Sequence, residues 1–333
     1  MTIPLLRSAC CCAVALLAGL ALTGWCADTK VEPLPLTGQT FIHDPSTILK
    51  DNGRYYVFGT GRGVLSESSP DLVHWTNGPA VFNQMPGWTF DTVPGFRGCW
   101  APDLIRVGDR FFLYYSISTW GKQLSALGLA TNRTLDSSST NFHWTDCGPV
   151  IQSTNGSAFN TIDPSVMLDA DGKLWMTFGS YWTGIYLIQL DPKTGLRTDT
   201  NAAPQRLAWN HSNNSIEASC LTRHGDFYFL FVNWGQCCKG TNSTYEVRVG
   251  RSQKIAGPYL DRAGKDLSDS GGSLFLESTG PFIGPGHIGI LNDGGPNWFS
   301  YHYYDANTEG RSRLALGQME WSDDAWPGAK KLK

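Results

Sequence analysis

Runs of aromatic and β-branched residues recur along the chain, and a glycine opens each of them. These runs span residues 53–58, 108–115, 172–178, 225–231 and 295–303. Glycine suits tight turns, and aromatic and β-branched side chains favour strands. The pattern therefore predicts a series of β-hairpins, each with a strand that follows a glycine turn.

A second repeat precedes these runs and sets an acidic residue beside small and apolar ones. Its members are Asp44, Asp103, Asp163 and Glu217, at spacings of 54 to 60 residues. Hairpin-bearing units of this length predict an all-β fold, a five-bladed β-propeller. A two-sheet sandwich is the alternative, and the regular order of the matched units makes it the weaker one.

Residues 41–333 contain no linker, so we expect a single catalytic domain preceded by a short N-terminal tail, residues 27–40. The composition, 12% aromatic and 17% charged with a net charge of −3, is that of a globular protein. It offers no basic surface for nucleic acid or an anionic membrane. The 13 tryptophans fit either a propeller core or surfaces that stack on sugars.

Residues 1–26 have the features of a secretory signal peptide, with an uncertain boundary. Arg7 supplies a short positive region, and the apolar run over residues 9–22 is too short for a confident membrane span. We therefore expect a secreted protein, periplasmic or extracellular. Membrane contact is expected only if Cys26 carries a lipid anchor, and an uncleaved membrane anchor is the remaining alternative.

An odd number of cysteines follows the signal, so at least one has no partner within the chain. They are Cys99, Cys147, Cys220, Cys237 and Cys238. Export would permit a disulfide. The adjacent Cys237 and Cys238 fit either a vicinal disulfide or two buried thiols, and no Cys-x-x-Cys pair indicates zinc.

Asp44, Asp163 and Glu217 carry the predicted chemistry, because the repeat sets them at equivalent points of the first, third and fourth blades. Such residues face one another across a propeller channel. Glycoside hydrolysis needs a carboxylate that takes a proton from water, an acid that protonates the leaving oxygen, and a charge that raises the pKa of the acid. Carboxylates that only cap backbone amides are the alternative, and Asp103 is expected to support the channel.

His287 lies in a Gly-Pro-Gly-His sequence at the inner position of the fifth blade. A single histidine is most often a core residue or a hydrogen-bond partner. On the channel axis, its imidazole could instead bind a metal ion whose other ligands are waters. His287 is therefore a candidate metal ligand, and His43, beside Asp44, is a candidate for the pocket wall.

Eight motifs are spread over residues 42–327. They are HDPS (43–46), WAPD (100–103), YYSISTWG (114–121), IDPS (162–165), FGSYW (178–182), IEA (216–218), CCKGTNSTY (237–245) and GPGH (284–287). As a set they resemble glycoside hydrolase family 43, and within it the endo-1,5-α-L-arabinanases. The resemblance implies a five-bladed propeller and an inverting mechanism. It implies that Asp44 is the general base, that Glu217 is the general acid, and that Asp163 tunes and orients the acid.

The same resemblance implies further site residues. The positions that match substrate contacts of the family are Asp44, Trp100, Trp120, Gly121, Asn160, Thr161, Ile162, Asp163, Ser180 and Tyr181, the two tryptophans as stacking surfaces. A calcium-type ion is expected in the central channel, held with the help of His287. Thr161 and Ser219 stand where the family often has alanine and proline, and neither change removes a catalytic group.

The expected function is hydrolysis of internal α-1,5-L-arabinofuranosyl linkages in arabinan, a side chain of pectin, by a secreted monomer. An exo-arabinanase, an α-L-arabinofuranosidase or a β-xylosidase of the same fold is the alternative, because loop shape separates these activities. A carbohydrate-binding propeller without catalysis is a further alternative. It would be expected to lack one of the three carboxylates, and this chain has all of them.

Overall fold

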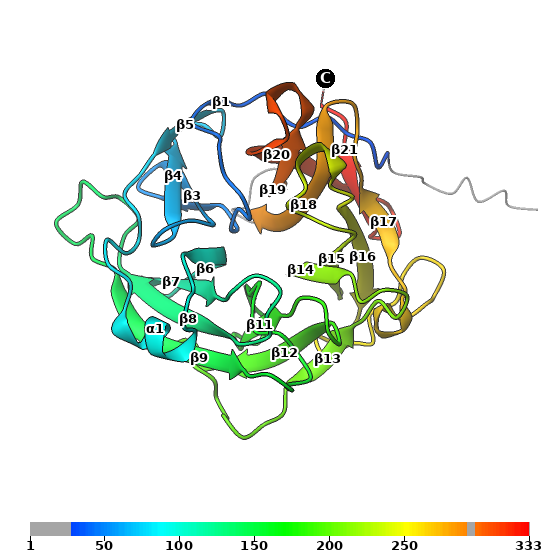
Figure 1. Ribbon diagram of the computed structural model, residues 1–333. Helices are drawn as coiled ribbons and strands as arrows, with labels where there is room; N and C mark the ends of the chain where they lie inside the picture. Colours follow the sequence, from blue (N-terminus) through cyan, green and yellow to red (C-terminus); the bar gives the residue numbers. More distant parts are fainter. Residues whose placement is uncertain (1–27, 292–296, 333) are drawn as a thin grey trace, which may run out of the picture.

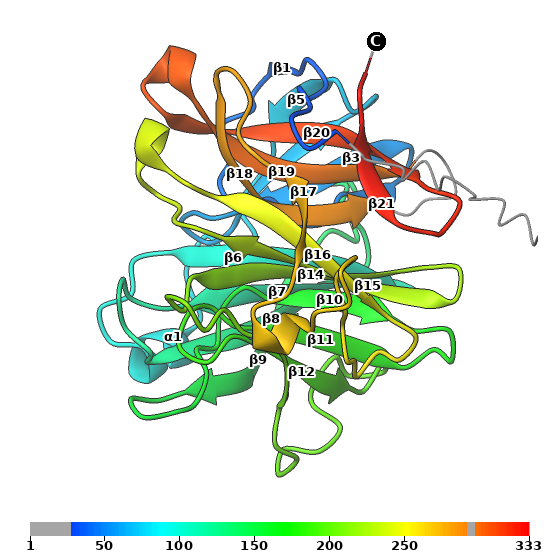
Figure 2. The same cartoon turned by 90° about the vertical axis from the view of Figure 1, so that its right-hand side faces the viewer.

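Five sheets surround a central channel, as the blades of a propeller do (Figure 1). This computed structural model describes residues 28–291 and 297–332. The predicted signal peptide, residues 1–26, lies outside the described residues. The prediction of a five-bladed β-propeller is confirmed, and Figure 2 shows the same ring from the side.

Each blade is one continuous segment, and in the second, fourth and fifth blades the first strand lies nearest the channel (Figure 1). The first blade contains β2 (Leu49–Asp51), β3 (Arg54–Gly59), β4 (Leu65–Ser69) and β5 (His74–Asn77), with β1 (Thr37–Gly38) at its outer edge. The second contains β6 (Cys99–Val107), β7 (Arg110–Ile117), β8 (Ser125–Asn132) and β9 (Thr145–Ser153). The third contains β10 (Ser165–Leu168), β11 (Leu174–Phe178), β12 (Ile185–Leu190) and β13 (Gln205–Ala208).

The last two blades repeat this order. The fourth contains β14 (Ile216–His224), β15 (Phe227–Trp234), β16 (Glu246–Ser252) and β17 (Ser273–Leu276). The fifth contains β18 (Phe282–Leu291), β19 (Trp298–Asp305), β20 (Arg311–Trp321) and β21 (Pro327–Lys330). A short helix, α1 (Gly87–Thr92), lies between the first two blades. No helix in the described parts of the chain is long and apolar enough to cross a membrane.

The glycine-led runs form the second strand of every blade, namely β3, β7, β11, β15 and β19. Each of these strands pairs antiparallel with the first strand of its blade, so the predicted hairpins are confirmed. Gly53 and Gly108 show why glycine opens the runs: their φ angles are 81° and 61°, a region that residues with a Cβ atom rarely adopt. Residues 292–296, including the glycine of the fifth run, are outside the description.

Apolar side chains fill the interfaces between neighbouring blades. The core divides into clusters, and each joins two adjacent blades; Phe112 and Leu129 of the second blade, for example, pack with Leu174 and Phe178 of the third. Burial of these side chains at about 25 cal/mol per Å² is the main force that holds the ring together. Leu, Val, Ile, Phe and Tyr dominate these clusters. Trp75 and Trp326 are buried in them, and six further tryptophans pack against them from partly buried positions.

The predicted N-terminal tail joins the last blade to the first. Its strand β1 pairs in parallel with β5, while Leu34 N–H donates to Leu316 O at 2.8 Å and Leu314 N–H donates to Thr40 O at 2.7 Å. Gly38 is needed here, because a Cβ atom would lie 2.2 Å from Trp75 O. The tail therefore closes the ring by backbone hydrogen bonds to both the first and the fifth blade, which meet at the seam of the ring.

A residue with left-handed backbone lies before or within the innermost strand of every blade. These residues are Asp44, Ala101, Asp163, Ala218 and His287, with φ angles of 50°, 40°, 58°, 50° and 58°. Register shifts follow in β6, β14 and β18. Such conformations are uncommon outside glycine and persist only where the surroundings hold them.

The surroundings hold each of these amides in the same way, with a side chain of the preceding blade. Asp44 N–H donates to His302 Nδ1 (3.1 Å), Ala101 N–H to Thr60 Oγ1 (2.9 Å), Asp163 N–H to Ser116 Oγ (3.1 Å), Ala218 N–H to Asp163 Oδ2 (3.1 Å) and His287 N–H to Asn233 Oδ1 (2.9 Å). In the third blade the corresponding second-strand residue is Gly179, which has no side chain, and the carboxylate of Asp163 takes its place.

The register of the repeat differs from the prediction at two acidic residues. Asp44 and Asp163 occupy the left-handed position, but in the second and fourth blades that position belongs to Ala101 and Ala218. Glu217 therefore lies one residue before Ala218, the left-handed position of its blade. Asp103 lies two residues after Ala101, the left-handed position of its blade. Register shifts lie at these points, between Trp100 and Asp103 in β6 and between Glu217 and Cys220 in β14.

Asp103 ties three blades together and so supports the channel. It is 5% exposed, its Oδ1 accepts Thr47 N–H of the first blade at 3.0 Å, and its Oδ2 accepts Val166 N–H of the third blade at 2.8 Å. Burial raises the pKa of Asp103, and the backbone amides oppose that rise by favouring the carboxylate.

Replacing Asp103 by asparagine should lower stability, because an amide group would then face a backbone N–H donor. The expected cost is about 2–3 kcal/mol of unfolding free energy, measured by denaturant titration. Asp109→Asn, on the exposed turn before β7, is the matched control and should change little. Equal stability of the two variants would show that Asp103 does not brace the blades.

Candidate active site

A cavity of about 790 Å³ opens at the channel and gathers most of the residues singled out in the sequence. Its lining includes Asp44, Trp100, Trp120, Gly121, Asn160, Ile162, Asp163, Ser180, Tyr181 and Glu217. Thr161 and His287 are buried and do not belong to the lining. Substrate contact at Thr161 therefore stays a prediction, and the other positions share one hollow.

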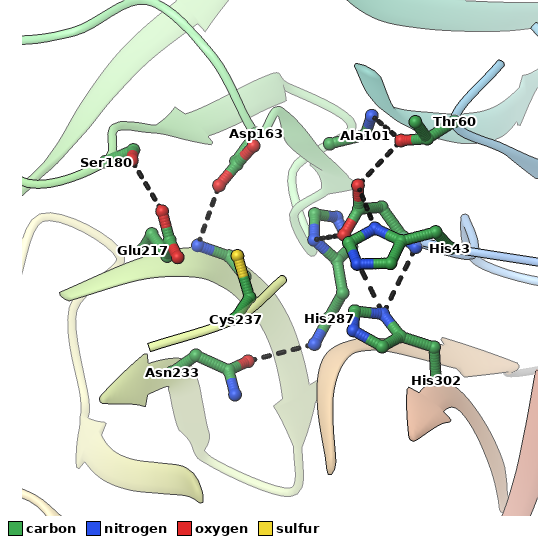
Figure 3. Close-up of polar contacts among 12 residues, drawn as sticks. His43, Thr60, Ala101, Asp163, Ser180, Glu217, Asn233, Cys237, His287 and His302 are labelled. Atoms are coloured by element: carbon green, nitrogen blue, oxygen red, sulfur yellow. Dashed lines mark hydrogen bonds and ion pairs between the residues drawn. The ribbon is translucent and has the colours of Figure 1, made fainter. Parts of the chain in front are cut away.

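The two carboxylate oxygens of Asp44 differ in their contacts, because only Oδ2 has partners at hydrogen-bonding distance. Thr60 Oγ1 donates to Oδ2 at 2.6 Å, and His43 Nδ1 lies 2.8 Å from the same oxygen. His287 Nδ1 and His302 Nδ1 lie at 3.5 and 3.7 Å from Oδ1. Oδ1 is therefore the oxygen left to accept a proton. Figure 3 shows the rings of His43, His287 and His302 gathered on this side of the site.

Positive charge around Asp44 keeps it ionised. Burial alone would raise the pKa of Asp44, but the charge and hydrogen bond of His43 outweigh burial and hold that pKa below its usual value. Burial in turn opposes a charge on His43, yet Asp44 raises the pKa of His43 to about 10. The two residues therefore form an ion pair at neutral pH.

Glu217 lies in a different environment, among hydroxyl groups. Ser180 Oγ donates to Oε2 at 2.6 Å, and Tyr245 Oη donates to Oε1. Glu217 is 7% exposed. Burial raises its pKa; the two hydroxyl groups oppose that rise, and the charge of Asp44 adds to it. Figure 3 places Ser180 and Glu217 on the side of the site opposite His43.

Asp163 lies beside Glu217, and the two carboxyl groups titrate as a pair. Its Oδ2 accepts Ala218 N–H at 3.1 Å, one residue beyond Glu217. Burial, followed by the charge of Glu217, raises the pKa of Asp163 well above its usual value. Two buried carboxyl groups so close do not both ionise near neutrality, so the pair retains a proton.

The side chains around His287 offer few of the ligand atoms that the predicted calcium-type ion would need. Burial lowers the pKa of His287, so the ring is neutral and offers a lone pair. The nearest described carboxylate is Asp44, whose Oδ2 is already bound to His43 and Thr60. A calcium-type ion prefers six to eight oxygen ligands. The donors fit such an ion only if water supplies nearly all the remaining ligands.

Another group of possible ligands, His43, Asp44 and His302, is already used internally. Their donor atoms lie within 4.8 Å of one another. However, His43 Nδ1 is paired with Asp44, and His302 Nδ1 accepts the Asp44 amide. These contacts occupy the lone pairs that a metal would need, so the group is better described as support for Asp44.

Aromatic side chains form one wall of the cavity. Trp100 and Trp120 meet edge to face, with ring centroids 6.3 Å apart, and Trp120 is 73% exposed. A large exposed ring beside a cavity is unusual for a core residue and suits stacking on a sugar. Trp182 also lines the cavity. These three tryptophans line the cavity, and stacking on a sugar stays a prediction for them.

Several site residues escaped the sequence pattern. They are Thr60, Trp182, Asn213, Asn214, Gln236, Lys239 and Tyr245, together with the two adjacent cysteines. Tyr245 and the cysteines belong to the CCKGTNSTY motif, which was a usable signal. Thr60 had none, because its role depends on contacts with Asp44 and Ala101 in other parts of the chain.

Known proteins similar to this chain are glycosidases. The family model described as glycosyl hydrolases family 43 matches residues 36–327. The extracellular endo-α-(1→5)-L-arabinanase 1 of Bacillus subtilis (strain 168) is 36% identical over 291 residues, 86% of this chain and 87% of that protein. The extracellular exo-α-(1→5)-L-arabinofuranosidase ArbA of Cellvibrio japonicus (strain Ueda107) is 35% identical over 300 residues, 87% and 86%.

Solved structures agree with the sequence relatives. The exo-1,5-α-L-arabinanase from a bovine ruminal metagenomic library superposes with a TM-score of 0.84 at 38% identity, over 89% of this chain and 99% of that one. The similarity therefore extends over the whole propeller.

Asp163→Asn should lower the pKa of Glu217, because it removes a negative charge that disfavours a second one nearby. Ser180→Ala should shift the same pKa upward, since it removes a hydrogen bond that favours the carboxylate. Carbon NMR of protein labelled at glutamate carboxyl groups measures both shifts. Shifts in the same direction would contradict the proposed coupling.

Proposed function

The chain belongs to glycosyl hydrolase family 43, and on that basis we propose that it cleaves internal α-1,5-linkages between L-arabinofuranosyl units of arabinan. The family model covers most of the chain, and the endo-arabinanase of Bacillus subtilis is similar over nearly its full length. The observation that carries the proposal is the pair of unlike carboxyl groups in one cavity, Asp44 held ionised and Glu217 with a raised pKa.

In the proposed reaction Asp44 is the general base. His43 and Thr60 hold Oδ2, so Oδ1 can face a water molecule in the cavity. The base removes a proton from that water as the water attacks the anomeric carbon. The imidazolium of His43 stabilises the carboxylate of Asp44 before the reaction.

Glu217 is the general acid and protonates the oxygen of the leaving sugar. Its partners favour this assignment, because the hydroxyl groups of Ser180 and Tyr245 can rotate to accept a hydrogen bond as well as donate one. Asp163 faces Ala218 N–H, which can only donate and therefore favours a carboxylate. We place the shared proton on Glu217 and the negative charge on Asp163, which keeps the acid protonated near neutrality.

Inversion at the anomeric carbon follows from this division of roles. The attacking water lies on the Asp44 side of the sugar, and the leaving oxygen lies on the Glu217 side. No protein atom forms a bond to the sugar in this scheme, so a single displacement reverses the configuration.

Exo action is the second candidate, and specific relatives support it. The Cellvibrio japonicus protein and the metagenomic structure are both described as exo-acting, at identities close to that of the endo-acting relative. The same carboxyl groups would serve either mode, and the reach of the loops around the cavity decides between them. α-L-Arabinofuranosidase or β-xylosidase action would also use this site.

We also propose export and an ion at His287. The two relatives described above carry the word extracellular in their names, which agrees with the signal peptide expected from the sequence. A bound calcium-type ion would supply positive charge at the channel, and His287 would hold it. We assign it a supporting role and no chemical step.

Hydrolysis of debranched linear arabinan, with products separated by size over time, tests the activity. Endo action predicts mid-sized oligosaccharides early, and exo action predicts one short product from the start. Asp44→Asn and Glu217→Gln should each lower kcat by about 10²–10⁴-fold while the protein stays folded. Asp109→Asn again serves as the control.

Two results would contradict the proposal. Proton NMR of the first products should show the anomer opposite to that of the substrate, and retention would rule out Asp44 as the base. A folded protein that cleaves neither arabinan nor aryl-arabinofuranosides nor aryl-xylosides would contradict hydrolysis and favour a carbohydrate-binding propeller without catalysis.

Dialysis against a chelator should lower activity and melting temperature, and added Ca²⁺ should restore both. His287→Ala should reduce the metal content of the purified protein, measured by mass spectrometry of the elements. Purified wild-type protein without bound metal, active in the presence of chelator, would make the ion proposal wrong.

A further inference from the structure

Two adjacent cysteines form part of the cavity wall between the base and the acid. Cys237 is half-buried, Cys238 is exposed, and both are free thiols with their sulfur atoms 2.8 Å apart. Both line the same cavity as Asp44 and Glu217. The expectation of two buried thiols is therefore wrong for Cys238, since the cavity exposes it. Thiols so close together and so open are poised to react with each other.

The backbone holds this pair in place. Cys238 has a left-handed φ of 62°, and its N–H donates to Tyr304 Oη at 2.7 Å. The preceding turn is closed by Thr244 N–H, which donates to Gln236 O at 2.9 Å. These bonds tie the thiols to both the fourth and the fifth blades, so their position relative to the catalytic groups is fixed.

Cys238 also lies next to a positive charge, the imidazolium of His43. Its sulfur is 3.7 Å from His43 Nε2, and the other nitrogen of that ring is 2.8 Å from Asp44 Oδ2. Thiol, imidazole and carboxylate therefore form a continuous row. Because His43 carries a proton in its ion pair with Asp44, its positive charge stabilises the thiolate form of Cys238.

The two thiols differ in reactivity. A hydrogen bond from Cys237, opposed by burial and assisted by His43, lowers the pKa of Cys238. The same hydrogen bond, with burial, raises the pKa of Cys237. Cys238 is also the more exposed of the two. Cys238 is thus the thiolate that attacks first, and Cys237 is the thiol that follows.

We propose that Cys237 and Cys238 form a modification site for small disulfides and close to a vicinal disulfide that alters the neighbouring acid–base groups. Cys238 Sγ attacks one sulfur of the small disulfide, whose S–S bond breaks and releases a thiol. Cys237 Sγ then attacks Cys238 Sγ and expels the second thiol. The two cysteines lose two electrons and two protons, which the small disulfide gains as two thiols.

Closure removes a negative charge from the cavity. Glu217 faces Asp163, Asp44, Tyr245 and Cys238, and the charge of the Cys238 thiolate contributes to the rise of its pKa after burial and Asp44. Without the thiolate, the acid should lose its proton at lower pH. This consequence for catalysis rests on the proposed function, whereas the thiol chemistry does not.

Oxidised glutathione and peptide mass spectrometry test the modification directly. Trypsin releases residues 224–239, whose two cysteines are Cys237 and Cys238. After treatment of the folded protein this peptide should lose two hydrogens, and dithiothreitol should restore them. Cys237→Ser should instead retain a glutathione adduct on Cys238. Cys147→Ser, which removes an exposed cysteine outside the cavity, should leave closure unchanged.

Two results would overturn the modification site. One is an unaltered 224–239 peptide in the wild-type protein, and the other is a lasting glutathione adduct on that peptide with no internal bond. Both are read by mass, so neither depends on whether the protein hydrolyses arabinan.

Kinetics test the effect on catalysis. The alkaline limb of the pH profile of kcat/KM should move to lower pH by about half a unit on oxidation. Cys238→Ser should show the shifted limb without oxidant and should not respond to oxidant. Identical profiles for the dithiol and disulfide forms would remove the link to the acid while leaving the disulfide itself established. An inactive protein that still closes the disulfide would count against the proposed function alone.

Discussion

The site depends on one hydrogen bond in each blade. The backbone N–H of a residue in left-handed conformation donates it to a side chain of the preceding blade. Five residues in left-handed conformation stand around the channel, and the neighbouring second strand, or Asp163 in its place, accepts the hydrogen bond of each. Backbone of this kind costs about 1–3 kcal/mol per residue, and the ring of acceptors stabilises it. The same contacts fix the direction of the side chains toward the channel. Asp44, Asp163 and His287 are themselves members of the ring, so the scaffold and the site share their atoms.

The two carboxyl groups of the cavity, Asp44 and Glu217, lie in electrostatically different surroundings. On one side, imidazoles of the first and fifth blades surround Asp44 and keep it charged. On the other, hydroxyl groups of the third and fourth blades surround Glu217, which burial disposes to stay neutral. One fold thus provides an acid and a base at the same pH by placing them in unlike neighbourhoods.

Much of this could be predicted from the sequence, and the remainder has a physical reason. Glycine before an aromatic run is a local signal, so the second strand of every blade was predictable. The carboxylates Asp44 and Asp163 were correctly aligned because they share one register. Glu217 and Asp103 were aligned one and two residues away from the left-handed positions, because alanines occupy those positions in their blades and an alanine gives no chemical signal. The partnership of Ser180 with Glu217 was beyond prediction, because these residues of the third and fourth blades meet only after the blades assemble.

The seam between the last blade and the first has a consequence for how the molecule is made. Leu34 and Thr40 bond to Leu316 and Leu314, residues from opposite ends of the chain. Contacts so distant in sequence form late, because the intervening chain must be ordered before its ends can meet. Locking of the ring therefore waits for the last blade, and Asp44 gains its partner His302 from that blade at the same moment. In a chain that is still being synthesised, Asp44 therefore lacks this partner, and the environment of its carboxylate is complete only in the finished ring.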